Sequence, residues 1–254
     1  MQKERLHKII ARSGITSRRK AERLIISGRV RVNRKIVKEL GIKVNPRKDK
    51  IYVDGRLLHP DRCRKYYYLA YKPRFMLTTL SDSQNRPTVA DLLQTYYINI
   101  KLFPVGRLDW NAEGLLLLTN DGELAHRIMH PRTHLPKIYL VKVRGRPGSK
   151  ILTLIRNGLR INCRTKYLPA QVKIIRKMPK FTVLRITLYE GKQSQIKKMF
   201  GYLGYVVLHI KRVSIGPLTL GHLFPGAIRP LTPSEERKLK KTVENLVKVD
   251  GSKN

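Results

Sequence analysis

Apolar residues near the start of the chain recur at the spacing of an amphipathic helix in two short segments. The first segment, 4–14, ends at a glycine, a residue typical of the end of a helix. The second, 16–28, offers Thr16 or Ser17 as its N-cap and also ends at a glycine. The pattern therefore predicts two helices joined by a short turn.

Shorter, alternating patterns follow these helices. Residues 29–37 alternate around Asn33, which predicts a hairpin, and residues 49–55 predict a further strand. We therefore expect residues 1–58 to form a small domain of their own, followed by a linker over residues 59–65.

The rest of the chain mixes both kinds of pattern, which predicts an α+β fold. Strands are predicted over residues 66–73, 102–109, 114–120, 137–145 and 181–191. Helices are predicted over residues 86–93, 120–130 and 194–204, with Asn120 as the N-cap of the second. We expect a large domain over 66–232, and a C-terminal helix with a disordered tail over 233–254.

Charge changes this picture more than any other property. The 254 residues include 54 Lys and Arg against 17 Asp and Glu, a formal net charge of +37. So strong a positive field repels itself unless a polyanion is near, so nucleic acid is the first candidate partner. An anionic membrane is the second, but no convincing amphipathic helix with bulky apolar residues supports it.

The positive charge is dense in the predicted small domain. Residues 1–58 hold 18 Lys and Arg against 5 Asp and Glu, a net charge of +13. The exposed face of its two helices would carry Lys8, Arg12, Arg18, Arg19 and Arg23. These residues favour contacts with phosphates, although a merely solvated charged face is the alternative.

Several features favour a cytoplasmic location for the protein. The first ten residues are charged and lack an apolar stretch, and every apolar run is too short to span a bilayer. Cys63 and Cys163 form no C-x-x-C motif, which suits a reducing compartment.

The stretch GRLDWNAEGLLLLTNDGEL, residues 106–124, places carboxylates in a chain where they are scarce. Asp109 lies between an Arg-Leu pair and Trp110, shortly before four consecutive leucines. From the spacing alone, Asp109 is either a catalytic carboxylate or a structural residue that caps a turn or pairs with Arg107.

Further segments occur in a recognisable order around this stretch. They are YKP (71–73) and RPTVADLL (86–93) upstream, and HP (130–131), KIY (137–139) and LYEGKQSQIKKMFGYLGYVVLHIKRVSIG (188–216) downstream. Together they resemble the RsuA/RluB-type ribosomal RNA pseudouridine synthases, and the basic N-terminal domain resembles an S4 RNA-binding domain of αL type. The resemblance implies a catalytic domain with a mixed, largely antiparallel sheet.

The resemblance also implies the reaction. A uridine in ribosomal RNA would be isomerised to pseudouridine: the base is detached, turned and rejoined through C5. Nothing is added or removed, so no cofactor is implied. A carboxylate suits this chemistry as nucleophile or as base toward the sugar, and the sequence does not choose between the two.

By resemblance, Asp109 is the essential carboxylate and Arg107 helps to hold the target nucleotide out of its stack. A simple phosphate contact is the alternative role for Arg107. Tyr139 would stack on the uracil, or else be a core tyrosine. Lys197 would pair with Asp109 and favour its charged form, a role that Lys198 could fill instead.

The same resemblance places Lys72, Gly106 and Leu108 in substrate binding. The sequence also departs from the family pattern in three places. Ala112 stands where a Thr is usual, Ser194 where an Arg is frequent, and Arg74-Phe75 where a Gly commonly follows the Lys-Pro pair. These differences affect loop geometry and target choice, and remove no core catalytic group.

His126, His130 and His134 recur every four residues, which on a helix would indicate a metal face. Pro131 is expected to end that helix, and the His-Pro pair belongs to the family motif, so we predict no metal site.

We therefore expect a monomeric enzyme that acts on ribosomal RNA or a pre-ribosomal particle, with the large-subunit RNA slightly favoured. A catalytically silent RNA-binding protein of ribosome assembly is the alternative. It explains the charge, but not the joint presence of Asp109, Tyr139 and Lys197. A DNA-binding protein is a weaker alternative, because no major-groove recognition helix is evident.

Overall fold

The computed structural model describes residues 3–59 and 64–251 and contains two compact units. The N-terminal unit comprises the residues up to Tyr66 together with Asn120–Gly122, and the C-terminal unit comprises the remainder. Cys63 and the middle of the predicted linker lie outside the described residues.

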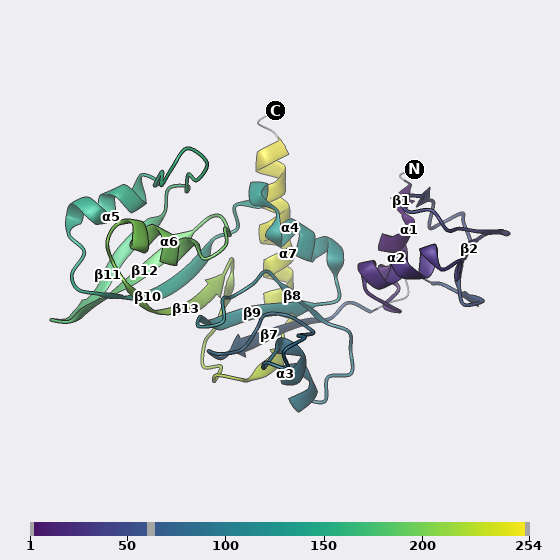
Figure 1. The fold of residues 1–254 in the computed structure, drawn as a ribbon, viewed down its shortest axis with the longest axis horizontal. Coiled ribbons are helices and arrows are strands. Elements are labelled where there is room, and N and C mark those ends of the chain that lie inside the picture. Colours follow the sequence, from purple (N-terminus) through teal and green to yellow (C-terminus); the bar gives the residue numbers. More distant parts are fainter. Residues whose placement is uncertain (1–2, 60–63, 252–254) are drawn as a thin grey trace. The chain divides into compact units, whose positions relative to one another are not determined.

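The N-terminal unit contains both predicted helices (Figure 1). Helix α1 spans Leu6–Arg12, and helix α2 spans Arg18–Ile26. The Ser17 hydroxyl accepts a hydrogen bond of 3.3 Å from the backbone N–H of Lys20. Ser17 rather than Thr16 is therefore the N-cap of α2.

The predicted hairpin is present as β2 (Val30–Val32) and β3 (Lys35–Ile36). Asn33 adopts a φ of +54° at its turn, a conformation that Asn tolerates better than most residues. The strand β5 (Ile51–Val53) pairs with β2 and with β6 (Arg56–Leu57), so the sheet has the order β3-β2-β5-β6.

The sequence pattern did not predict a second, two-stranded sheet of this unit, between β1 (Glu4–Arg5) and β4 (Lys43–Val44). A core joins the helices to both sheets. Its buried members are Leu6, Ile9, Ile10, Ala21, Ile25, Val30, Val44, Ile51, Val53 and Leu58. The apolar positions that predicted the helices are thus the ones that fold the unit.

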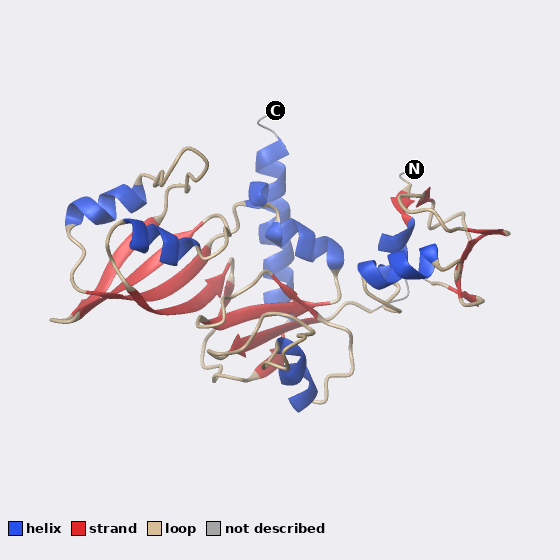
Figure 2. Ribbon diagram, in the orientation of Figure 1, coloured by secondary structure: helices blue, strands red, loops and turns tan. Residues whose placement is uncertain are grey.

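The C-terminal unit is built on one nine-stranded sheet (Figure 2). Its strands are β7 (Tyr67–Lys72), β8 (Phe103–Val105), β9 (Glu113–Thr119), β10 (Lys137–Arg144), β11 (Gln171–Lys177), β12 (Phe181–Leu188), β13 (Val207–Ile215), β14 (Leu218–Thr219) and β15 (Ile228–Pro230). The main path is β11-β12-β10-β13-β9-β7-β15, with β8 paired to β9 and β14 to β13.

Within the described residues, every strand pair of this sheet is antiparallel except β9 with β13. This confirms the predicted α+β fold with a mixed, largely antiparallel sheet. The parallel pair is short, and Arg212 lies opposite Gly114 in it. It joins the two halves of the sheet.

Different helices cover each half. They are α3 (Val89–Thr95), α4 (Gly122–Met129), α5 (Ser149–Arg156), α6 (Gln195–Tyr202) and α7 (Pro233–Gly251), with a 3-10 turn over Pro131–Thr133. In Figure 1, α5 and α6 lie over β10–β12, whereas α4 and α7 lie over the half that contains β7 and β9. Two separate apolar cores match this division.

Helix α3 lies on the opposite side of β7 and β9 from α4 and α7 (Figure 1). Both faces of β9 are therefore covered, and all four leucines of Leu115–Leu118 are completely buried. A continuous apolar run is typical of a strand covered on both faces. The buried run anchors the loop that precedes it, which contains Asp109.

The structure differs from the sequence prediction at several elements. Helix α5 and strands β11 and β13 were not predicted. Helix α4 begins at Gly122, so Asp121 and not Asn120 directly precedes it. The Asn120 side chain instead bonds the backbone of Arg64 and Tyr66.

Candidate active site

Asp109 lies in the loop between β8 and β9. A hydrogen bond of 3.0 Å from the backbone N–H of Ala112 to the carbonyl of Asp109 closes its turn. Gly106 begins the loop at a φ of +81°, a conformation that favours glycine. The Leu108 side chain is buried and fixes the loop to the core. Asp109 itself remains partly exposed, with 29% of its side-chain surface accessible.

Two side chains from the start of α6 contact the Asp109 carboxylate. The Lys197 ammonium lies 3.3 Å from Asp109 Oδ2, and the Ser194 hydroxyl donates a hydrogen bond of 3.0 Å to the same oxygen. Lys197 also donates to Asn111 Oδ1. The adjacent Lys198 is exposed and makes no such contact with Asp109. The structure thus brings Lys197, and not Lys198, to the carboxylate.

Asp109 and Ser194 border an open pocket at the junction of the two halves of the sheet. Its lining includes Arg107, Leu108 and Asp109 from the loop, and several residues between Leu188 and Ile196. Tyr139 contributes from β10 and is 9% exposed, so it belongs both to the core and to the pocket wall. Arg107 is exposed at this pocket.

The segment between β7 and α3 is hydrogen-bonded to the Asp109 loop. The Thr78 hydroxyl donates to the carbonyl of Leu108 at 2.7 Å and accepts from its N–H at 3.1 Å. The N–H of Phe75 donates to the carbonyl of Trp110 at 2.7 Å. These bonds fix the backbone on both sides of Asp109.

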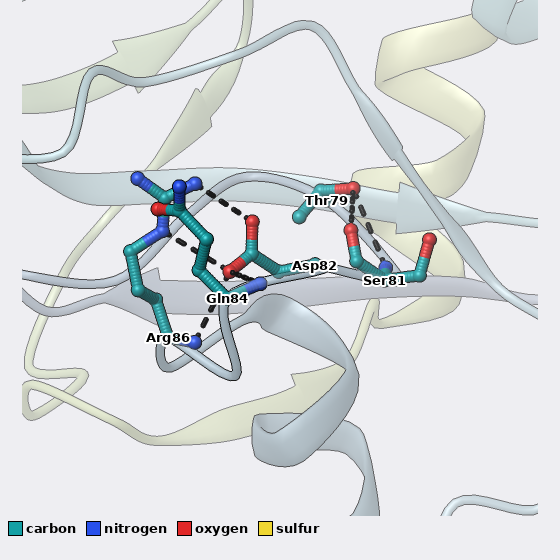
Figure 3. Close-up of polar contacts among 5 residues, drawn as sticks. All are labelled: Thr79, Ser81, Asp82, Gln84 and Arg86. Carbon is teal, nitrogen blue, oxygen red and sulfur yellow. Dashed lines mark hydrogen bonds and ion pairs between the residues drawn. The ribbon is translucent and has the colours of Figure 1, made fainter.

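The same segment is itself stiffened by a local network (Figure 3). The Asp82 carboxylate accepts hydrogen bonds from the Arg86 guanidinium at 2.8 and 3.1 Å and from the backbone N–H groups of Gln84 and Arg86. The bonds from Arg86 lower the pKa of the Asp82 carboxyl to about 2. The Thr79 hydroxyl bonds the backbone of Ser81 further along the segment.

Lys72 does not occupy the substrate-binding position that the sequence resemblance gave it. Its side chain is completely buried, and its ammonium donates to the carbonyls of Pro73 at 2.7 Å and Met76 at 2.8 Å. Burial lowers the pKa of Lys72 to about 8, and the nearby Glu113 opposes this effect. We correct the prediction: Lys72 supports the backbone behind the site and is inaccessible to RNA here.

The sequence reasoning missed Arg212, which lies on β13 and is 2% exposed. Its Nε donates to the carbonyl of Leu115 at 2.8 Å, and its Nη1 donates to the carbonyl of Arg107 at 3.3 Å. It thereby ties the start of β9 to the Asp109 loop. Its position in the final motif was visible, but its burial depends on the unpredicted strand β13.

Glu190 was also missed, and it shapes the segment before α6. It is 9% exposed and accepts hydrogen bonds from the Gln195 amide at 2.8 Å and from the N–H of Leu168 at 2.9 Å. The Lys192 ammonium lies 3.2 Å from its other oxygen. These contacts fix the turn from which Ser194 and Lys197 reach Asp109.

Comparison with known proteins assigns the chain to a family. The sequence profile described as RNA pseudouridylate synthase matches residues 66–202, and that of the S4 domain matches residues 4–51. A relative from Aquifex aeolicus (strain VF5), named as an uncharacterized RNA pseudouridine synthase, is 44% identical over 244 residues, with 96% of each chain covered. The chain belongs to the RNA pseudouridylate synthase family.

Other relatives agree with this assignment. The ribosomal large subunit pseudouridine synthase B of Bacillus subtilis (strain 168) is 40% identical, and the match covers 93% of this chain and 96% of that one. A crystal structure of a pseudouridylate synthase superposes with a TM-score of 0.67 at 31% identity, covering 92% of this chain and 99% of that one. This RNA pseudouridine synthase is therefore an isomerase with an N-terminal S4 domain, which confirms the predicted fold and enzyme class.

The structure divides the five basic residues predicted to bind RNA through the S4 domain. Lys8 on α1 and Arg18, Arg19 and Arg23 on α2 are exposed. Arg12 is instead half-buried, and its guanidinium bonds both carboxylate oxygens of Glu4 at 2.9 and 3.1 Å. This ion pair lies within the domain, and the predicted RNA contact of Arg12 stays a prediction.

Within residues 3–59 and 64–251, no group of three or more His, Cys, Asp and Glu side chains could hold a metal ion. His126 and His130 contact each other with ring centroids 5.4 Å apart, but His134 follows the 3-10 turn that begins at Pro131. No helix in this part of the synthase is long and apolar enough to cross a membrane.

Proposed function

We propose that this pseudouridine synthase isomerises a specific uridine of ribosomal RNA, with the large-subunit RNA favoured, and that Asp109 is its essential carboxylate. One observation carries the proposal: Asp109 borders an open pocket while Lys197 and Ser194 from α6 contact its carboxylate. The name of the Bacillus subtilis relative supports the choice of the large-subunit RNA.

The reaction leaves the atomic composition of the RNA unchanged. The bond between the sugar and N1 of uracil breaks, the base turns, and a bond from the sugar to C5 forms. C5 then loses its proton, and N1 gains one. Asp109 acts at the sugar, as nucleophile or as base. Lys197 offsets the negative charge of the carboxylate, and Ser194 fixes one of its oxygens. The proposed reaction needs no cofactor.

The residues around Asp109 are suited to holding the target nucleotide. The exposed Arg107 at the pocket suits a role in holding the target nucleotide out of its stack. Tyr139 in the pocket wall presents an aromatic ring for the uracil. Gly106 and Leu108 contribute through the shape of the loop and not through polar side chains.

We further propose that the enzyme acts as a monomer in the cytoplasm, on ribosomal RNA or a pre-ribosomal particle. A transcriptome-wide pseudouridine map of cells with and without the protein tests the proposal. We expect the loss of the protein to remove pseudouridine from one position in the large-subunit RNA. Unchanged ribosomal RNA would contradict it and favour the silent assembly factor or an RNA of another class.

The exposed arginines of α2 give a prediction for RNA binding. Replacing Arg18, Arg19 and Arg23 together with Ala should weaken binding, because fewer counterions are released per complex. We expect the slope of log affinity against log salt to become shallower by up to about 2 for three single-strand phosphate contacts. A salt titration with labelled ribosomal RNA measures this slope.

A triple variant of equal charge change provides the control. Arg237, Lys238 and Lys241 are exposed on α7, and we expect their joint replacement with Ala to change the slope less. Equal slopes for the two triple variants would assign the S4 residues to the general positive field and not to specific phosphate contacts.

A further inference from the structure

Phe75 has an unusual backbone for its residue type. Its φ is +59°, in the left-handed region that disfavours side chains with a Cβ atom, and 54% of its surface is exposed. Neither burial in the core nor backbone preference therefore explains a phenylalanine here. Backbone strain of this kind is often found at ligand-binding positions, where the surrounding structure enforces it.

The neighbours of Phe75 form a defined group with it. The Phe75 and Trp110 rings lie with centroids 6.1 Å apart and planes tilted by 60°, an arrangement typical of attractive aromatic pairs. The guanidinium carbon of Arg74 lies 4.9 Å from the centroid of the Phe75 ring. We call Arg74, Phe75 and Trp110 the aromatic platform.

The platform is fixed in place and accessible. The hydrogen bond from the N–H of Phe75 to the carbonyl of Trp110 joins its two segments, and Thr78 secures the Asp109 loop alongside. Trp110 is 37% exposed, and Arg74 is also exposed. Trp110 directly follows Asp109 in the same loop, so the platform lies next to the pocket lining without being part of it.

We infer that the aromatic platform binds an unpaired base of the RNA next to the target nucleotide. Aromatic rings stack on nucleic-acid bases without regard to their identity, and an arginine can stack on a base while it neutralises a phosphate. The strong positive charge of the chain favours a polyanion over an apolar protein partner at this surface. This inference rests on the proposed function, because the base belongs to the same RNA.

The chain contains one tryptophan, so the fluorescence of Trp110 reports on the platform directly. We expect a short single-stranded oligouridylate to quench this fluorescence until it saturates. A polyphosphate of equal charge, which has no bases, should bind the positive surface with little quenching. Equal quenching by both polyanions would contradict base stacking at the platform.

Phe75→Gly tests the residue that carries the inference. Glycine accepts the left-handed backbone and removes the whole exposed side chain, so the protein should remain folded. We expect its affinity for the oligouridylate, measured by fluorescence anisotropy of the labelled RNA, to fall about tenfold, or about 1.4 kcal/mol. Circular dichroism and the melting temperature should show a native fold.

Tyr97→Gly is the matched control. Tyr97 is also an exposed aromatic residue with a positive φ, +52°, and it is 89% exposed in the loop after α3. Its replacement should leave RNA affinity unchanged. Equal affinities of the two variants and the unmodified protein would overturn the inference.

The outcomes separate this inference from the proposed function. If the unmodified protein modifies ribosomal RNA but Phe75→Gly binds RNA normally, the inference about the platform is wrong and the proposed function stands. If Trp110 responds to RNA and Phe75→Gly weakens binding, but the pseudouridine map is unchanged without the protein, the platform remains and the proposed function is wrong.

Discussion

Asp109→Asn should lower the rate of pseudouridine formation by about 10²–10⁴-fold, the usual contribution of a group that acts in acid–base catalysis, or to background if Asp109 is the nucleophile. The asparagine keeps the size of the side chain but loses the charge that faces Lys197 at 3.3 Å. RNA affinity should stay equal or rise slightly, since a negative charge leaves a site that faces a polyanion.

Activity, RNA affinity and melting temperature should be measured together on this variant. Glu244→Gln serves as the control for loss of a carboxylate, because Glu244 is exposed on α7 away from the pocket residues. It should retain full activity. Near-normal turnover by well-folded Asp109→Asn protein would exclude a catalytic carboxylate at this position and leave Asp109 a structural role.

Gly114→Ala should destabilise the C-terminal unit by about 4 kcal/mol, the sum of backbone strain and overpacking. Gly114 has a φ of +110°, and a Cβ atom there would lie 2.2 Å from the backbone carbonyl oxygen of Arg212. The obstacle is the backbone of the parallel partner strand, so no side-chain rotation relieves it. The melting temperature should fall by about 10 °C or more.

Gly145→Ala separates the two contributions. Gly145 also has a positive φ, +77°, but a Cβ atom there would meet nothing within 4 Å. Its destabilisation should therefore come from backbone strain alone, about 1–3 kcal/mol. Trp110 fluorescence during urea unfolding reports on the unit that contains both glycines. Equal destabilisation of the two variants would mean that the β9–β13 contact relaxes easily.

The elements that the sequence predicted well are those with a local cause. The apolar spacing within residues 4–14 and 16–28 is sufficient to define α1 and α2, because each helix buries one face. The four leucines before Thr119 similarly indicate a strand covered on both faces. Neither prediction needs knowledge of distant parts of the chain.

The contacts of the candidate site could be predicted only through the family resemblance. Asp109 and Lys197 are far apart in the sequence, and no periodicity relates them. The resemblance suggested their pairing, and the structure places Lys197 beside Asp109. It did not suggest Ser194 as a partner, because Ser194 was noticed only as a departure from the family pattern.

The structure pairs Lys72 and Arg12 internally, which the sequence prediction did not anticipate for either residue. A basic side chain in a motif or on a helix favours an exposed position, yet each of these residues finds polar partners inside its own unit. Those partners are backbone carbonyls for Lys72 and Glu4 for Arg12. Such pairing depends on the tertiary fold, which the type and position of a residue in the sequence do not reveal.

The position of β13 bears on how this chain can fold during synthesis. Residues 207–215 come late in the sequence, yet they lie between β10 and β9 in the middle of the sheet. Until they leave the ribosome, two inner strands present unpaired edges, which are templates for aggregation. A nascent chain that ends before Val207 should therefore be a strong client for chaperones that shield exposed strands.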